Sequence, residues 1–320
     1  MSKSQRDAVI QGYGHVFSRN PIDRGEKERR DETIISKMAE SSDSLFLPLR
    51  NLDLLVDTSE LDEHPSLKWI KLEQLQERNI TNTPIFLGIL EGTYRFAIDV
   101  TGEYFQDQYL KTLNPHLRFI DVRTCGEMLE PGDAGLAAQA RIQTNWHQKY
   151  KYCSSCGSET TMKRGGQVRS CTTCGTQHFP RTDPVIIVVV HDGDRCLLGQ
   201  SRGRLQQTNT YSALAGFVDQ GESIEEAVAR EVMEEAGIKV KNVSYHSSQP
   251  WPLPYSLMIG CHAEADTTAI NMDPEEMTDV KWFSREEVLQ SLDGNTDILR
   301  IPMKLAIAHH LVKSWALGEI

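Results

Sequence analysis

Three glutamates in the C-terminal half of the chain are spaced as metal ligands would be. Glu231 is followed three and four residues later by Glu234 and Glu235, so on a helix their carboxylates lie along one edge. Like charges at this spacing repel, and a hard divalent cation such as Mg²⁺, which binds carboxylates together with substrate phosphates, relieves the repulsion. Arg230 can pair with Glu234 and orient it. The alternative is a solvated acidic helix face that binds nothing.

The helix that would position these glutamates carries its own end signals. Ser223 is a favourable N-cap, and Glu226 three residues later completes a capping box. Gly237 is a natural C-terminal stop, which predicts a helix of about thirteen residues between the two ends. Apolar residues recur at helical spacing and should face a core, namely Ile224, Ala227, Val228 and Val232.

The acidic segment is part of a longer pattern that runs from Gly216 to Ile238. It fits G-x5-E-x7-R-E-U-x-E-E-x-G-U, in which U is aliphatic. The fixed positions are Gly216, Glu222, Arg230, Glu231, Glu234, Glu235 and Gly237. If each fixed residue type occurs at about 5–7%, a chance match in this chain has a probability on the order of 10⁻⁶. The segment resembles the Nudix box without departure at a fixed position, which favours a functional site over a bare acidic surface.

Resemblance to the Nudix box implies a metal-dependent pyrophosphohydrolase with two or more Mg²⁺ or Mn²⁺ ions. The implied metal ligands in the box are Glu231, Glu234 and Glu235. One glutamate would also act as general base, and the sequence leaves open which one. Glu222 would order the loop before the helix and join the metal site through water. In the family, a glutamate just before a Trp-containing strand supplies a further ligand; the matching position is Glu276, with Glu275 and Asp273 as competitors.

Four of the seven cysteines form a second constellation. Cys153-x2-Cys156 and Cys171-x2-Cys174 are separated by fourteen residues, and two such knuckles can wrap one tetrahedral zinc ion. A glycine follows each knuckle, where the backbone must turn tightly. Four thiolates leave no open position, so the zinc would be structural. Two disulfides or a redox motif are the alternatives. Lys163, Arg164 and Arg169 keep a nucleic-acid contact by this zinc ribbon open.

A proline-rich segment presents a tryptophan after the acidic helix. Residues 248–256 are SQPWPLPYS, a stiff extended stretch in which Trp251 either plugs a core or offers its indole to a flat ligand. The segment resembles the signature of the NADH pyrophosphatase branch of the Nudix hydrolases, although Leu253 stands where that signature commonly has Phe. A four-cysteine zinc ribbon before the catalytic domain is a further feature of that branch. The resemblance is firm over about residues 150–315.

This resemblance implies hydrolysis of the diphosphate of NADH or NAD⁺ to nicotinamide mononucleotide and AMP. Phe217 and Trp251 would cradle a ring of the dinucleotide, with Gln249 and Ser256 as polar partners. A homodimer is implied with substrate sites near its interface, where Phe179 would contribute to substrate binding. Removal of NAD caps from RNA 5′ ends is an alternative within the same chemistry. A zinc-ribbon nucleic-acid-binding protein with an inactive hydrolase domain is a second alternative, and no motif glutamate is missing to favour it.

The remaining pattern predicts the elements that hold these sites. The apolar run Val185–Val190 is typical of a strand buried on both faces. We expect a helix over Ala134–Tyr150 capped by Asp133, a strand over Tyr211–Ala215 and a final helix over Ile301–Trp315. The predicted fold class is α+β multidomain: a Nudix α/β/α sandwich with a mixed sheet, preceded by a zinc ribbon and an N-terminal α+β domain. The expected domains are 1–130, 131–182 (linker helix and ribbon) and 183–320.

Composition limits the remaining classes. The formal net charge of −11 argues against a protein that coats nucleic acid without specificity. We expect no membrane partner, because no apolar run approaches the length of a membrane span. A reduced-looking cysteine set and the absence of a signal-peptide pattern predict a cytoplasmic protein. A peroxisomal location stays open, although no C-terminal targeting tripeptide is present.

Overall fold

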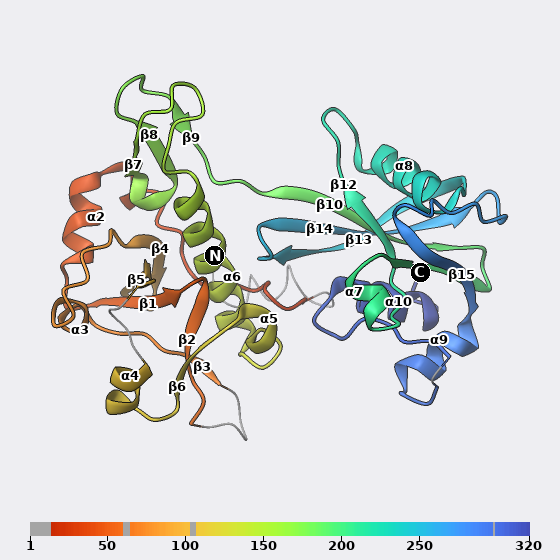
Figure 1. The fold of residues 1–320 in the computed structure, drawn as a ribbon, viewed down its shortest axis with the longest axis horizontal. Helices are drawn as coiled ribbons and strands as arrows, with labels where there is room; N and C mark the ends of the chain where they lie inside the picture. Colours follow the sequence, from red (N-terminus) through yellow and green to blue (C-terminus); the bar gives the residue numbers. More distant parts are fainter. Residues whose placement is uncertain (1–13, 60–64, 103–106, 297) are drawn as a thin grey trace. The chain divides into compact units, whose positions relative to one another are not determined.

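The computed structural model describes residues 14–59, 65–102, 107–296 and 298–320 (Figure 1). The chain divides into two compact units. The first consists of Met1–Arg181 and Trp251–Tyr255, and the second of Thr182–Pro250 and Ser256–Ile320. The fold class predicted from the sequence is confirmed, whereas the three domain boundaries stay predictions.

The first unit is built on a six-stranded sheet covered by a long helix. The strand order is β3-β2-β1-β5-β4, with β6 also paired to β2. Only the β1–β5 pairing among those described is parallel. The strands are β1 (Ser44–Arg50), β2 (Asp53–Asp57), β3 (Ser66–Leu67), β4 (Ile85–Leu90), β5 (Thr93–Asp99) and β6 (Leu117–Ile120). The helices are η1 (Glu28–Arg30), α2 (Glu32–Ala39), α3 (Leu72–Gln76), α4 (Asp107–Leu113), α5 (Val122–Cys125) and α6 (Pro131–Lys149).

Helix α6 begins earlier than predicted and is not capped by Asp133. Pro131 occupies its first turn, where a missing N–H costs no hydrogen bond, and Glu130 is the N-cap residue. The Asp133 carboxylate instead accepts a hydrogen bond from the Leu67 N–H at 3.3 Å, so it ties the helix to β3. The cap prediction was wrong because a proline at the first helical position defines the helix start.

The zinc-ribbon segment is a small three-stranded sheet joined firmly to the rest of the first unit. It comprises β7 (Thr160–Lys163), η2 (Arg164–Gly166), β8 (Val168–Cys171) and β9 (Gln177–His178). Arg29 is 1% exposed, and its guanidinium donates to carbonyls on both sides of the junction: Arg24, Phe86, Leu87, Arg164 and Gly165. Burial lowers the Arg29 pKa to about 10. A buried cation satisfied only by carbonyls fixes the geometry of every segment it joins.

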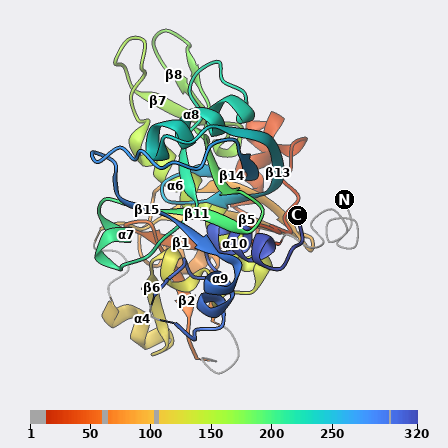
Figure 2. The same cartoon turned by 90° about the vertical axis from the view of Figure 1, so that its right-hand side faces the viewer.

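The second unit is an α/β/α sandwich around a mixed sheet of order β13-β14-β10-β11-β15, with β12 also paired to β10. Its strands are β10 (Asp183–His191), β11 (Arg195–Ser201), β12 (Leu214–Phe217), β13 (Val240–Trp251), β14 (Ser256–Ala265) and β15 (Met277–Ser284). Its helices are α7 (Arg204–Gln207), α8 (Ile224–Ala236), α9 (Arg285–Leu292) and α10 (Ile307–Ala316). Figure 2 shows α8 on one side of this sheet and α9 with α10 on the other.

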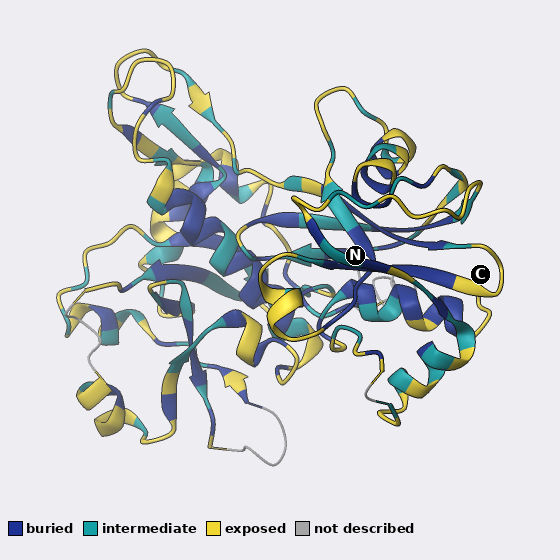
Figure 3. Ribbon diagram, turned by 45° about the vertical axis from the view of Figure 1, so that its right-hand side comes forward, coloured by how far each residue is buried: buried dark blue, intermediate teal, exposed yellow. Residues whose placement is uncertain are grey.

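Strand β10 is the centre of the second unit. Ile186 and Val188 face the core under α8, whereas Ile187 and Val189 face the core under α10. The strand pairs in parallel with β14 and antiparallel with β11 and β12. Most of its residues are therefore buried (Figure 3). The prediction of a strand buried on both faces is confirmed.

Three further element predictions need correction. The final helix begins at Ile307, not Ile301, because Pro302 lacks the N–H that a helix interior needs. Strand β12 begins at Leu214; Tyr211 precedes it, and its N–H donates to the Arg300 carbonyl. The proline-rich segment is not extended throughout, because β13 ends at Trp251 and residues 252–255 form the turn to β14. Within the described residues, no helix is long and apolar enough to cross a membrane.

Candidate active site

Helix α8 positions the acidic edge as its sequence predicts. It spans Ile224–Ala236, and Ser223 and Glu226 form the reciprocal capping box, with hydrogen bonds of 3.2 and 2.7 Å. Gly237 ends the helix in the left-handed conformation at φ 69°. The apolar stripe is buried, with Val228 and Val232 at 0% exposure. Burial of that stripe fixes the rotation of the helix, so the glutamate edge cannot turn away from the loop that precedes it.

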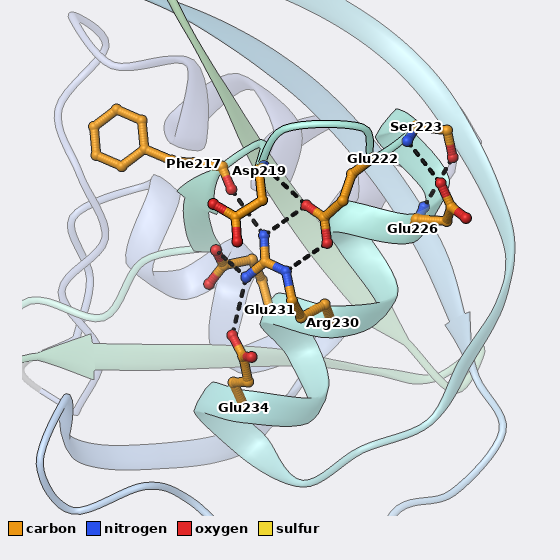
Figure 4. Close-up of polar contacts among 8 residues, drawn as sticks. All are labelled: Phe217, Asp219, Glu222, Ser223, Glu226, Arg230, Glu231 and Glu234. Atoms are coloured by element: carbon orange, nitrogen blue, oxygen red, sulfur yellow. Dashed lines mark hydrogen bonds and ion pairs between the residues drawn. The ribbon is translucent and has the colours of Figure 1, made fainter.

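Arg230 connects the helix to the loop before it through hydrogen bonds to four residues (Figure 4). Its guanidinium donates to both carboxylate oxygens of Glu222, at 2.6 and 2.9 Å. It also donates to Glu231 at 2.8 Å, to Glu234 at 2.9 Å and to the Phe217 carbonyl at 2.9 Å. The predicted pair with Glu234 is confirmed. The bidentate pair with Glu222 links the helix to the loop before it, and sequence reasoning missed it.

The hydrogen bonds between Arg230 and Glu222 change the pKa of both groups. The hydrogen bonds from Arg230 lower the pKa of Glu222 to about 2, and they raise the pKa of Arg230 itself. Glu222 also accepts from the Asp219 N–H at 2.9 Å, so it holds the loop between β12 and α8 in place. This geometry is what a loop-ordering role for Glu222 requires.

Glu235 differs from its neighbours because Arg230 does not reach it. Its side chain is 7% exposed, and its Oε2 atom has no hydrogen-bond partner. Burial raises its pKa to about 8, and the charges of Glu231 and Glu276 contribute to this increase. A hydrogen bond from the Ala215 N–H has the opposite effect and lowers the pKa. Burial likewise raises the pKa of Glu231, opposed by Arg230. A buried carboxylate oxygen without a donor, next to further carboxylates, fits a bound cation.

Gly216 leaves room for Glu231. A Cβ atom built on Gly216 would lie 1.9 Å from the carboxyl carbon and Oε1 of Glu231, which is far inside van der Waals contact. Gly216 belongs to β12, whose pairing with β10 places Gly216 opposite Ile186. Because the central strand fixes β12, the backbone cannot retreat. The motif therefore needs glycine at this position for steric space and not for an unusual φ.

Glu276 comes to the site from the loop before β15. After burial, its charge is one of the causes that raise the pKa of Glu231 and that of Glu235. The competing Asp273 carboxylate accepts a hydrogen bond from the Glu275 N–H at 2.8 Å, so it serves the loop itself. These contacts favour Glu276 as the further ligand, and that role stays a prediction.

The five predicted substrate contacts are divided between the units. Phe217 is 57% exposed at the end of β12, and Phe179 is 62% exposed in the first unit. Trp251, also in the first unit, packs edge-on against Phe17 at 6.1 Å between ring centroids. Ser256 is buried at the start of β14. All five binding roles stay predictions.

Gln249 has a structural task that the sequence did not reveal. It is fully buried, donates to the Leu305 carbonyl and accepts from the Ile307 N–H, both at 2.8 Å. Ile307 is the first residue of α10, so Gln249 satisfies one of the free N–H groups at the start of that helix. These contacts favour a helix-positioning role for Gln249 over a direct contact with substrate.

The four cysteines of the paired knuckles converge as predicted. Their Sγ atoms all lie within 4.8 Å of one another, with Cys156 at 3.5 Å from both Cys171 and Cys174, and Cys153 at 3.7 Å from Cys174. Zn–S bonds of about 2.3 Å in a tetrahedron require S–S separations of about 3.8 Å. All seven cysteines are free, so the disulfide alternative is wrong for this structure. The donor set is compatible with one structural zinc ion.

The turns and neighbours of the cysteine cluster complete this picture. Gly157 and Gly175 adopt φ of 73° and 74°, which confirms the tight turns expected after each knuckle. His178 Nε2 lies 3.4 Å from Cys153 Sγ, and Thr176 Oγ1 lies 3.1 Å from Cys174 Sγ; sequence reasoning missed both contacts. Among the described residues, this is the only group of three or more His, Cys, Asp or Glu ligand atoms so closely spaced. The carboxylates of Glu231, Glu234, Glu235 and Glu276 do not form such a closely spaced group in the structure.

We expect zinc removal to disorder the ribbon. Structural zinc contributes about 10–16 kcal/mol in zinc-finger peptides, far more than three short strands can replace. The Cys171→Ser variant should therefore lose its zinc and become sensitive to proteolysis between residues 150 and 180. Zinc content by mass spectrometry and limited proteolysis measure this. Cys125→Ala, at a buried cysteine outside the cluster, is the matched control and should retain zinc. Retained zinc in Cys171→Ser would contradict the assignment.

Comparisons with known proteins agree with this geometry. Residues 180–302 match the NUDIX domain, and residues 43–146 match the NADH pyrophosphatase-like rudimentary NUDIX domain. The chain is 34% identical to the NAD-capped RNA hydrolase NUDT12 of Pongo abelii, over 94% of this chain and 73% of that protein. It is 34% identical to the NAD-capped RNA hydrolase NudC of Stutzerimonas stutzeri, over 81% of this chain and 87% of that protein.

A match over a shorter segment of the chain has a higher sequence identity. The NAD-capped RNA hydrolase NUDT12 of Macaca fascicularis is 46% identical over 198 residues, which is 58% of this chain. This match spans only 42% of the length of the macaque protein. Enzymes with the NUDIX domain use divalent metal ions, in agreement with the cation-fitting carboxylates around Glu235. With its intact acidic motif and both domain matches, the chain belongs to the Nudix hydrolase family, in the NADH pyrophosphatase-like group that joins a rudimentary to a complete Nudix domain.

Proposed function

We propose that the chain hydrolyses the diphosphate bond of NADH or NAD⁺ to nicotinamide mononucleotide and AMP, with Mg²⁺ or Mn²⁺. The observation that carries this proposal is the buried Glu235 carboxylate, which has an oxygen without a donor and a pKa raised by burial and then by its acidic neighbours. A divalent cation bound there would keep this carboxylate ionised and would give its Oε2 atom the partner that it lacks. The relatives carry names of NAD-capped RNA hydrolases and, in mouse, of an NAD(P)H pyrophosphatase.

The residues that would hold the cations are Glu231, Glu234, Glu235 and Glu276. Ions bound there would neutralise the charge of the diphosphate and would lower the pKa of a bound water molecule. Arg230 keeps Glu231 and Glu234 oriented and, through Glu222, keeps the preceding loop in place. Phe217 and Trp251 each offer an aromatic ring to the bases or the nicotinamide.

Product analysis tests this proposal directly. The protein is incubated with NADH, NAD⁺, ADP-ribose or diadenosine polyphosphates, under Mg²⁺ and then Mn²⁺, and the nucleotides are separated by chromatography. From NADH and from NAD⁺ we expect AMP and the nicotinamide mononucleotide in equal amounts. A folded protein that releases no AMP from any dinucleotide with either ion would refute the proposal.

Removal of NAD caps from RNA is the second candidate, favoured by the names of three relatives matched over most of this chain or of their own length. The bond broken is the same, so the same glutamates would serve. Comparing kcat/KM for NAD-capped RNA with that for free NADH separates the two. The third reading, an inactive nucleic-acid-binding protein, would require salt-dependent RNA binding without metal-dependent turnover.

We expect Trp251→Ala to weaken substrate binding without disabling the chemistry. Stacking of a base on an aromatic side chain is worth about 1–3 kcal/mol, so KM for NADH should rise about 5- to 150-fold while kcat changes little. Trp251→Phe should retain part of the affinity. Tyr245→Ala, at an exposed aromatic on the same strand, is the control. An unchanged KM in Trp251→Ala would assign the indole to packing against Phe17 alone.

Two further features belong to the proposal. We propose a homodimer with substrate sites near its interface, where the exposed Phe179 would contribute to substrate binding, and light scattering of the purified chain measures its mass. We also propose a reducing compartment such as the cytoplasm, because all seven cysteines are free. Both are independent of the chemistry at α8.

A further inference from the structure

The position of Glu276 is not set by helix α8. Glu231, Glu234 and Glu235 share one helix, so their mutual geometry follows from its period. Glu276 instead lies in the loop between β14 and β15, and it is exposed. The next residue, Met277, is nevertheless buried in the core that lies under α8, together with Val228 and Val232. Something outside the helix must hold this loop close to the acidic edge.

Arg202 makes the contacts that hold the loop. Its guanidinium donates through Nε, at 3.0 Å, and through Nη2 to the carbonyl of Pro274. Its main-chain N–H donates to the carbonyl of Glu276 at 3.0 Å. Arg202 is therefore hydrogen-bonded to the residues on both sides of Glu275. Two donors converging on one carbonyl also fix the direction of the guanidinium, as a single bond would not.

Arg202 can do this because β11 ends there. Ser201, the last residue of β11, pairs with Met277, the first residue of β15, just after a register shift between Gln200 and Ser201. The shift ends regular pairing and leaves the next N–H of this strand for the Glu276 carbonyl. Inside the loop, the Met277 N–H donates to the Asp273 carbonyl at 2.9 Å, so the turn is closed upon itself.

These contacts show how the Arg202 side chain is used. An arginine beside an acidic site could contact a substrate phosphate or remain solvated. The Arg202 guanidinium is instead committed to a carbonyl of the loop that carries Glu276. Arg204, two residues further on, is exposed in the short helix α7 and provides a matched comparison.

We propose that Arg202 is a positioning residue for the divalent-cation site: it holds the Asp273–Glu276 turn so that the Glu276 carboxylate joins Glu231 and Glu235 around the ion. The proposal rests on the proposed function, since it assigns Arg202 a task in the same metal site. Arg202 touches neither the substrate nor the ion. Its effect passes through Glu276 alone.

Metal binding measured without substrate tests this role. Free Mn²⁺ is followed by electron paramagnetic resonance while the zinc-loaded protein is titrated. Loss of a residue that orients a metal ligand typically costs about 10–100-fold in metal affinity. We expect Arg202→Ala to raise the Mn²⁺ Kd about tenfold, at the low end of that range because the residue is exposed. At saturating Mn²⁺, kcat should stay near that of the parent protein, and Arg204→Ala should match the parent in both.

A double-mutant cycle shows whether the effect passes through Glu276. In the Glu276→Gln background, Arg202→Ala should no longer change the Mn²⁺ Kd, because the ligand it positions is already gone. Arg202→Lys keeps the charge but offers no planar pair of donors, so its Kd should lie between those of the parent and Arg202→Ala. Thermal unfolding of each variant checks the fold, and Arg202→Lys serves if Arg202→Ala does not fold.

The outcomes separate this inference from the proposed function. An unchanged Mn²⁺ Kd in Arg202→Ala, or an equal rise in both backgrounds, would overturn the positioning role. A raised KM for NADH with an unchanged Mn²⁺ Kd would assign Arg202 to the substrate phosphates and overturn it as well. A parent protein that binds no Mn²⁺ and releases no AMP would instead refute the proposed function itself.

Discussion

We expect Glu235→Gln to lose about 10²–10⁴-fold in kcat, whether Glu235 supplies charge to the cations or accepts a proton. The amide keeps the shape of the side chain and can still accept from the Ala215 N–H, so the fold should persist. What it loses is the negative charge at the buried Oε2 position. The measurement is kcat for NADH at saturating Mn²⁺. Glu286→Gln, in the first turn of α9, is the matched control and should be fully active.

The same variant should change how stability depends on pH. Without Mg²⁺ or Mn²⁺, the Glu235 pKa is about 8 in the folded protein, compared with 4.5 for a free glutamate side chain. Between these values the folded state holds a proton that the unfolded state has released, so stability falls as pH rises through this window. The stabilising contribution of the proton is complete below about pH 4.5 and lost above about pH 8.

Denaturant unfolding of the zinc-loaded protein at pH 6 to 9 measures this effect. Glu235→Gln cannot release that proton, so its free energy of unfolding should exceed that of the parent increasingly as pH rises. Added Mn²⁺ should stabilise the parent at high pH and the variant much less. An active Glu235→Gln protein, or equal pH slopes for the two proteins, would contradict the assignment of Glu235 as a buried, cation-binding carboxylate.

We expect Gly216→Ala to lose about 10²-fold in kcat, because a displacement of roughly 1 Å at a reacting centre is enough for such a loss. The added Cβ would lie 1.9 Å from the Glu231 carboxyl group, which must then move away from the position where Arg230 holds it. The helix itself should remain, since its core stripe and caps are untouched.

A second glycine provides the control for Gly216→Ala. Gly132 lies in the first turn of α6, and its added Cβ would meet only Pro21, at an ordinary contact distance of 3.5 Å. Gly132→Ala should therefore retain full activity. Circular dichroism and the unfolding temperature report the fold, while the Mn²⁺ Kd reports the displaced ligand. Parental kcat and Mn²⁺ affinity in Gly216→Ala would show that the site does not depend on the observed position of Glu231.

Features that depend on residues close together in the chain could be predicted from the sequence. Helix α8 has the predicted start, end and buried stripe, because capping and helical period act within a few residues. The paired knuckles were recognisable because ligand spacing reflects the size of a zinc site. Strand β10 was predicted from its continuous apolar run. Each of these signals is complete within one short segment.

Contacts between segments that are distant in the chain depend on the tertiary structure. Gln249 meets the start of α10, 58 residues away, and Arg202 meets Pro274, 72 residues away. Neither pairing has a local signal, because it depends on which strands become neighbours and in which register. The missing donor at Glu235 and the space that Gly216 leaves are likewise properties of packing. The residues of the site could therefore be predicted from the sequence. Their distances, their burial and therefore their protonation depend on how the sheet and its helices pack.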